Sequence, residues 1–185
     1  MKGKGLLIII GVIIILAISL GGSYNKLAVL DENVEGAWAQ VENVLKRRAD
    51  VIPNLVSTVK GYAEHEENVL TEITKARSGL QNASTPQEFA EADAQLNSAI
   101  DSLNIVVEAY PELKANQNFL ELQAELASTE NKIATERMRY NETVNSYNTT
   151  IRRFPTSLLA GVFNFDKRVY FEINQQDAEV PKVDF

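Results

Sequence analysis

The chain has 185 residues and a mass of 20.6 kDa, enough for one domain with its own hydrophobic core and a short appendage. Its formal charge of -7 and isoelectric point near 4.9 argue against nucleic acid binding, which needs a basic face. The absence of cysteine excludes disulfides, a thiolate nucleophile and cysteine-ligated metals. Glycine and proline are sparse, which favours helices.

An uncharged apolar run, GLLIIIGVIIILAISLGG, covers residues 5–22. As a helix it measures roughly 27 Å, close to the roughly 30 Å hydrocarbon core of a bilayer. Lys2 and Lys4 precede it and Lys26 follows, a weak asymmetry that favours a cytoplasmic N-terminus. The alternative is a cleaved signal peptide, but the run is long for one and no A-x-A cleavage triplet follows. We therefore predict an uncleaved single-pass anchor over residues 1–22.

Between residues 28 and 80 the apolar residues recur at alternating steps of three and four. This spacing predicts one long helix with a single buried stripe, which other segments must cover. Pro53 removes the hydrogen bond to the carbonyl of Ala49, so we expect a kink there. The stripe consists of Val34, Trp38, Val41, Leu45, Ile52, Leu55, Val59, Tyr62, Val69, Ile73, Ala76 and Leu80.

Two further helices complete the predicted bundle over residues 23–155. Thr85-Pro86-Gln87-Glu88 has the pattern of a capping box and predicts that a helix begins there and covers residues 85–110. Pro111 ends it, and Asn116 can cap a third helix over residues 116–154. Apolar residues recur every seventh position in the third helix, at Phe119, Leu126, Ile133, Tyr140, Tyr147 and Phe154. The prediction is an all-α fold, an elongated coiled-coil-like bundle of three long helices.

Some charged residues fall at inward positions of this bundle. Arg48 and Glu66 lie on the inward side of the first helix, and Glu130 and Arg137 interrupt an apolar column of the third. The first two either extend to solvent near the proline or make a polar bond inside the bundle that fixes its register. Glu130 and Arg137 can meet them across the bundle, and a Glu66–Arg137 pair is one such hypothesis.

The remaining segment, residues 156–185, is too aromatic for a disordered end. Ser157–Phe163 can form a short apolar helix. We expect this tail to pack over one end of the bundle; the alternative is a contact with another subunit or with the membrane surface.

No catalytic, cofactor-binding or metal-ligating residue is assigned. The single histidine, His65, has no carboxylate or imidazole three or four residues away, as a helical metal site would need. Phosphate-binding, dinucleotide-binding and nucleophile-elbow motifs are absent. Three glycosylation sequons begin at Asn82, Asn141 and Asn148, as chance predicts in a chain this rich in Asn, Ser and Thr.

Three stretches resemble the LemA family of bacterial envelope proteins: AWAQVENVLKRRADVIPNLVSTVKGYAEHE, YPELKANQNFLELQAELASTENKIATERMRYNETVNSYNTTIRRFP and the closing YFE with PKVDF. The resemblance covers essentially everything after the apolar run. It implies a membrane-anchored bundle of long antiparallel helices without established enzymatic activity, and one family relative is associated with magnetosome membrane formation. The positions that fit the family pattern are Trp38, Arg47, Arg48, Pro53, Asn54, His65, Glu66, Phe119, Leu122, Glu130, Asn131, Arg137, Tyr140, Asn141, Tyr147, Asn148, Phe154 and Pro155.

From these features we expect a non-enzymatic, single-pass protein of the inner membrane whose bundle lies outside the cytoplasm. It acts as a scaffold for protein partners or for copies of itself, with membrane lipid contacted through the anchor and no cofactor. The alternative is a sensor that binds a small molecule between its helices. An enzyme is the least favoured class, because nucleophile, metal set and phosphate loop are missing.

Overall fold

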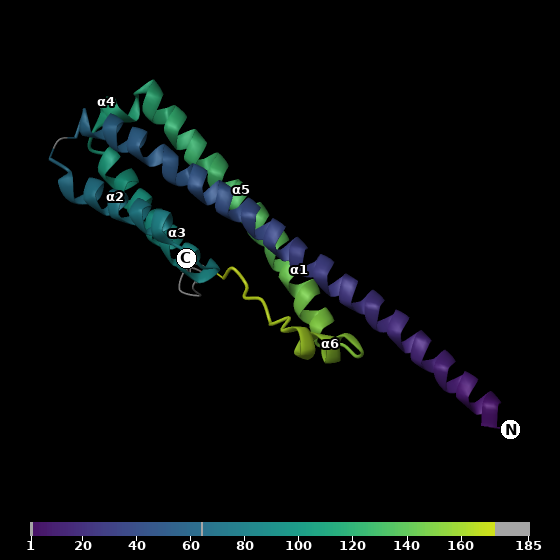
Figure 1. Cartoon of the computed structure of the whole chain (residues 1–185). Coiled ribbons are helices and arrows are strands. Elements are labelled where there is room, and N and C mark those ends of the chain that lie inside the picture. The colour runs from purple at the N-terminus through teal and green to yellow at the C-terminus, as the bar shows by residue number, and fades with distance from the viewer. Residues whose placement is uncertain (1, 64, 173–185) are drawn as a thin grey trace, which may run out of the picture. The chain divides into compact units, whose positions relative to one another are not determined.

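The computed structural model is all-α, as expected (Figure 1). It describes residues 2–63 and 65–172, without the side chains of residues 2–9, 12, 13 and 15–17. No strand occurs in this part of the chain. The helices are α1 (Lys2–Lys60), α2 (Glu67–Asn82), α3 (Pro86–Val107), α4 (Pro111–Lys114), α5 (Gln117–Ile151) and α6 (Thr156–Phe163).

The chain folds into two compact units, and α1 and α5 each contribute to both. The first unit comprises Met1–Ala39 and Arg139–Val169, and the second comprises Gln40–Met138 and Tyr170–Phe185. The core of the first unit contains Leu27, Val34, Tyr140, Val144, Tyr147, Ile151 and Ala160. The core of the second is larger and includes Val41, Leu45, Ile52, Leu55, Val59, Ile73, Leu80, Phe89, Leu96, Leu103, Leu113, Phe119, Leu126 and Ile133.

The prediction of a single helix over residues 28–80 is wrong, because α1 ends at Lys60 and a turn leads into α2. The amides of Tyr62 and Ala63 both donate to the carbonyl of Val59, at 3.0 and 2.9 Å, which closes the last turn of α1. Gly61 lies at this point, and glycine weakens a helix by about 0.5–1 kcal/mol relative to alanine. Tyr62 is therefore exposed instead of lying on the buried stripe.

The predicted helix starts are confirmed. Thr85 Oγ1 accepts from the amide of Glu88 at 3.2 Å, and the Glu88 carboxylate accepts from the amide of Thr85, which completes the capping box of α3. Asn116 Oδ1 accepts from the amide of Phe119 at 3.0 Å and caps α5. α1 runs through Pro53, and the kink at this residue stays a prediction.

The third predicted helix ends earlier than expected. α5 stops at Ile151 instead of residue 154, so Phe154 leaves the helical column and is 81% exposed. α6 follows and ends at Phe163. The next residue, Asn164, caps it, and the left-handed backbone of Asn164 (φ 57°) places the Phe165 amide 3.0 Å from the Ala160 carbonyl. Residues 165–172 are neither helix nor strand, and residues 173–185 lie outside the description.

In the part of the chain that the structure describes, no helix carries an apolar stretch long enough to cross a membrane. More than half of the run over residues 5–22 has its side chains outside that part. The expected anchor therefore falls largely on side chains that the structure does not describe. The division into an anchor over 1–22, a bundle over 23–155 and a tail over 156–185 stays a prediction.

Candidate functional site

A buried arginine, Arg48, links three helices of the second unit. Its side chain is 3% exposed. Nη1 lies 2.7 Å from Asp93 Oδ1 in α3 and 2.6 Å from Glu130 Oε2 in α5, and Nη2 donates to Asn97 Oδ1. Arg48 Nε is buried and makes no hydrogen bond. Because α1, α3 and α5 each supply a member, this Arg48 cluster (Arg48, Asp93, Asn97 and Glu130) fixes their register.

The interior alternative for Arg48 is thus confirmed, with Glu130 as one of its partners. Asp93 was missed, although a signal for it exists in the sequence. It follows Phe89 by four residues and precedes Leu96 by three, so it belongs to the apolar face of α3. A charged residue at such a position requires a buried partner of opposite charge.

Burial raises the pKa of the Asp93 carboxyl above its usual value of 3.8, and the Arg48 guanidinium opposes this rise. The nearby Glu130 carboxylate adds to it, because a second negative charge disfavours ionisation of the first. Arg48 therefore lowers the pKa of Asp93 while burial raises it, and the effect of burial is the larger of the two. The cluster therefore holds charged groups in the interior of the second unit.

The hypothetical Glu66–Arg137 pair is not among the contacts of the described residues. Glu66 lies before α2, where its Oε1 accepts a hydrogen bond from the hydroxyl of Tyr110 at 3.0 Å. This bond raises the pKa of Tyr110. The neighbouring Tyr62 hydroxyl accepts from the side-chain Nδ2 of Asn116 at 2.9 Å, so this end of the second unit is held by side chains at helix termini.

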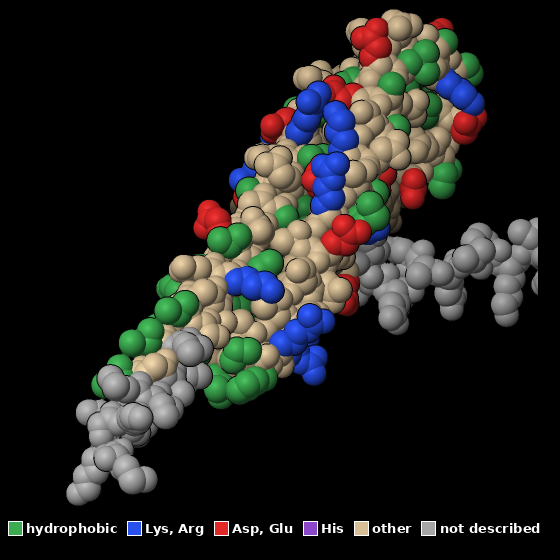
Figure 2. Space-filling model, turned by 90° about the vertical axis from the view of Figure 1, so that its right-hand side faces the viewer, with side chains coloured by type: hydrophobic (Ala, Val, Ile, Leu, Met, Phe, Trp, Pro, Cys, Tyr) green, Lys and Arg blue, Asp and Glu red, His purple; other side chains and the backbone are tan. Residues whose placement is uncertain are grey.

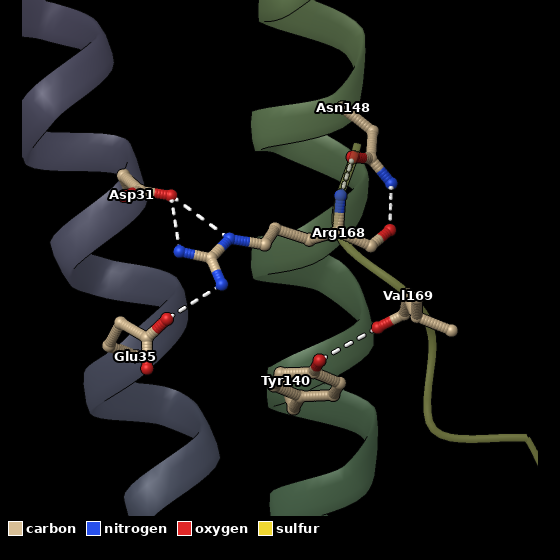
Figure 3. A network of polar contacts seen from close by, with 6 residues as sticks. All are labelled: Asp31, Glu35, Tyr140, Asn148, Arg168 and Val169. Atoms are coloured by element: carbon tan, nitrogen blue, oxygen red, sulfur yellow. Dashed lines mark hydrogen bonds and ion pairs between the residues drawn. The ribbon is translucent and has the colours of Figure 1, made fainter. Parts of the chain in front are cut away.

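A second polar group, the Arg168 cluster (Asp31, Glu35, Tyr140, Asn148 and Arg168), lies in the first unit (Figure 3). The Arg168 guanidinium extends from the non-helical segment after α6 toward α1. There its Nη2 lies 2.9 Å from Asp31 Oδ1, and its Nη1 lies 2.8 Å from Glu35 Oε1. Desolvation lowers the pKa of Arg168, but the hydrogen bond to Asp31 and the two carboxylate charges outweigh it, so the guanidinium stays charged.

The backbone of the same segment is bonded to α5. The buried Asn148 amide donates to the carbonyl of Arg168 at 2.8 Å, and its Oδ1 accepts from the amide of Arg168 at 2.9 Å. The Tyr140 hydroxyl donates to the carbonyl of Val169 at 2.7 Å, and burial raises the pKa of that hydroxyl. Asn148, which the sequence marks as part of a sequon and as a position of the family pattern, therefore binds the backbone with both polar atoms of its side chain.

His65 and Trp38 are two other residues whose side chains have chemical uses, and the structure shows where each of them lies. His65 is exposed in the connection between α1 and α2, and the described residues hold no group of three or more His, Asp or Glu that could bind a metal. Trp38 is half-buried, and its ring lies 5.3 Å from that of Tyr140 at 59°. The Arg48 cluster holds helices in register, and the Arg168 cluster holds the segment after α6 against α1 and α5.

Comparison with known proteins places the chain in a family. The LemA family model matches residues 37–185. Protein LemA of Metamycoplasma hominis is 28% identical over 88% of this chain and 73% of that protein. Magnetosome protein MamQ 2 of Paramagnetospirillum magneticum is 24% identical and Magnetosome protein MamQ of Magnetospirillum gryphiswaldense 22%, each over 80% of this chain. The chain spans 64% of the length of these two magnetosome proteins.

None of these names is that of an enzyme. The family match includes both the Arg48 and the Arg168 clusters, except for the α1 carboxylates Asp31 and Glu35. Because the family model covers most of its residues, the chain belongs to the LemA family.

Proposed function

We propose that this protein is a non-catalytic scaffold, tethered to the inner membrane of the cell envelope by the N-terminal part of α1. The observation that carries the proposal is the continuity of α1, which runs from Lys2 to Lys60 without a break. The uncharged run over residues 5–22 is therefore the same helix that enters the core at Leu27. Because α1 is continuous, an anchor at its N-terminal end is joined to the folded part of the chain by the helix itself.

The surface of this helix supports the tether. Ile10, Ile14, Ile18 and Leu20 are exposed large apolar side chains, and no charged residue occurs between Lys4 and Lys26. Exposed apolar surface of this extent is characteristic of contact with a membrane or a protein. Lys2 and Lys4 favour a cytoplasmic N-terminus, and in this proposal the folded part of the chain lies on the other side of the membrane.

The polar chemistry of the described residues supports a structural role. The Arg48 and Arg168 clusters bond helices and backbone to one another. As a scaffold, this chain would bind a protein partner or further copies of itself. No feature of the described residues favours the alternative of a small-molecule sensor.

The tether is tested by extracting membranes that contain the full chain with alkaline carbonate. We expect the chain to stay in the membrane pellet. Replacing Ile10 and Ile14 with lysine should release it, since a lysine near the centre of a membrane helix costs about 2.5–3.5 kcal/mol. The matched control is Ile105→Lys, at an exposed apolar position of α3, which should leave the chain in the pellet. Release of the unmodified chain would overturn the tether.

The scaffold is tested by cross-linking in intact membranes. A scaffold gives either a homo-oligomer of fixed size or one recurrent protein partner, and the product persists when the protein is expressed at a low level. Only monomers over a range of cross-linker concentrations would overturn it. A reporter enzyme fused after Phe185 tests the orientation, and activity of a cytoplasm-specific reporter would contradict it.

A further inference from the structure

The short helix α6 exposes an apolar surface in the first unit. Its sequence, TSLLAGVF, contains no charged residue. Thr156 and Ala160 are buried against the unit, whereas Leu158, Val162 and Phe163 are 60%, 73% and 52% exposed. Leu158 and Val162 are four residues apart and therefore share one face of the helix. With Phe154, the preceding exposed ring, these residues form what we call the α6 patch (Phe154, Leu158, Val162 and Phe163).

The α6 patch adjoins the point where the uncharged run of α1 ends. The ring of Tyr24 lies 4.9 Å from that of Phe163 and 5.9 Å from that of Phe165. Tyr24 follows Gly22 by two residues, which is about 3 Å along the helix axis. If residues 5–22 lie in a bilayer, these three rings are at the level of the lipid headgroups, where aromatic residues are enriched in membrane proteins.

Basic side chains flank the patch in sequence. Arg152 and Arg153 directly precede Phe154, Lys167 follows α6, and Lys26 follows Tyr24 by two residues on α1; all four are exposed. Asp166 is the one acidic residue between Arg152 and Lys167. Figure 2 shows hydrophobic side chains near the N-terminal part of the chain with Lys and Arg side chains close to them. This combination suits an anionic surface, because each basic residue near such a membrane contributes about 1 kcal/mol.

We propose that the α6 patch docks into the headgroup region of an anionic phospholipid bilayer, next to the point where α1 leaves the membrane. This inference rests on the proposed membrane tether. The tether itself argues for lipid as the occupant, since it brings the bilayer to the level of Tyr24. Docking adds a second contact beside the anchor, so that the first unit is held against the surface instead of pivoting on α1.

The absence of cysteine allows a direct test, because single cysteines can be introduced and labelled in the full chain. An environment-sensitive fluorophore is placed at Leu158→Cys, at Ile14→Cys in the uncharged run, and at Ile105→Cys as an exposed control on α3. Each variant is reconstituted into vesicles of phosphatidylcholine with phosphatidylglycerol, or of phosphatidylcholine alone, with a nitroxide-labelled lipid as quencher. Helix content by circular dichroism shows that each variant is folded.

Docking predicts strong quenching at positions 158 and 14 and little at 105. It also predicts at least threefold stronger quenching at 158 in the anionic vesicles, a difference that Arg152→Glu with Arg153→Glu should abolish. Quenching at 14 without quenching at 158 would overturn docking and leave the tether standing. Quenching at 158 without quenching at 14 would overturn the tether alone, and quenching at neither would overturn both.

Two further outcomes separate other occupants of the patch. Equal quenching at 158 in both kinds of vesicle would overturn the requirement for anionic lipid. Disulfide formation between unlabelled Leu158→Cys chains, with no quenching of the labelled form, would overturn docking in favour of a contact between two copies.

Discussion

Arg77 in α2 donates a hydrogen bond from its Nε to the carbonyl oxygen of Ala49 in α1, 2.9 Å away. In an uninterrupted helix that carbonyl would accept from the amide of residue 53, but Pro53 has no amide hydrogen. The proline thus creates an unsatisfied acceptor inside α1, and a side chain from the next helix satisfies it. A local defect in one helix becomes a specific contact that binds α2 to α1.

Replacing Arg77 with alanine should lower the free energy of unfolding by about 1–3 kcal/mol, because the Ala49 carbonyl is left without a donor. In a Pro53→Ala background the amide of residue 53 supplies that donor, and the same replacement should cost much less. Urea unfolding of the four proteins of this double-mutant cycle measures the difference. Lys75→Ala, at an exposed position of α2, is the control. An equal cost of Arg77→Ala in both backgrounds would contradict the assignment.

Asp93→Ala should be severely destabilising, by about 3–5 kcal/mol, since it removes the buried carboxylate partner of Arg48. Arg48→Met combined with Asp93→Leu should cost less than Asp93→Ala alone, because the buried guanidinium is removed together with its buried carboxylate, and the remaining Glu130 side chain is partly exposed. Glu130→Gln should cost about 0–1 kcal/mol, as its carboxylate is partly exposed to solvent. Urea midpoints with unchanged slopes would establish these differences. A double variant less stable than Asp93→Ala would show that packing, not charge, dominates.

The raised pKa of Asp93 predicts an unusual dependence of stability on pH. At a pH well above the raised pKa the carboxyl is ionised in both the folded and the unfolded chain. As the pH falls through the raised pKa of the folded state, the folded chain takes up a proton before the unfolded chain does. The contribution of Asp93 to stability therefore increases on acidification and is complete below about 3.8, the unfolded value.

This is measured as the difference in unfolding free energy between the unmodified chain and Asp93→Asn from pH 7 to pH 3.5. Titration of the other carboxylates largely cancels in this difference. We expect the unmodified chain to gain stability relative to the variant as the pH falls. A relative loss would mean that Arg48 dominates over burial and holds the pKa of Asp93 below its usual value.

Local signals in the sequence predicted local structure well. The capping box at Thr85 and Glu88 and the cap at Asn116 act over three residues, so the chain itself specifies them. The turn after Lys60 is marked only by Gly61, a weak signal, because the apolar spacing continues almost in phase from Val59 to Ile73 and no proline interrupts it. Periodicity shows which face of a helix is buried, but it does not show whether the chain reverses direction.

Long-range pairs were predictable only in part. The inward positions of Arg48 and Glu130 marked both as candidates for a buried contact, and the structure joins them. Asp93, 45 residues from Arg48, lies on a face that otherwise reads as apolar, so its charge was overlooked. Asn148 and Arg168 pair through the backbone of a non-helical segment, and helical periodicity carries no information about such a segment.

Asn148 makes the sharpest prediction for the C-terminal segment. Asn148→Ala should expose the amide of Arg168 to hydrogen exchange, because Asn148 Oδ1 is its acceptor. Loss of both backbone bonds should lower stability by about 1–3 kcal/mol. Tyr140→Phe removes only the bond to the Val169 carbonyl and should leave exchange at Arg168 nearly unchanged. Arg168→Ala should cost no more than about 1 kcal/mol and depend on salt, because its ion pairs are partly exposed.

Exchange followed by mass spectrometry of the peptide that contains Arg168 distinguishes these three variants. In Arg168→Ala the backbone bonds to Asn148 remain, so the amide at position 168 should stay protected while the salt dependence of stability disappears. Loss of protection in this variant, with protection retained in Asn148→Ala, would mean that the ion pairs with Asp31 and Glu35 hold the segment in place. We expect Asn148→Ala to cost more stability than Arg168→Ala because of burial. The side-chain amide of Asn148 is buried, whereas water competes with the Arg168 guanidinium for its partly exposed carboxylate partners.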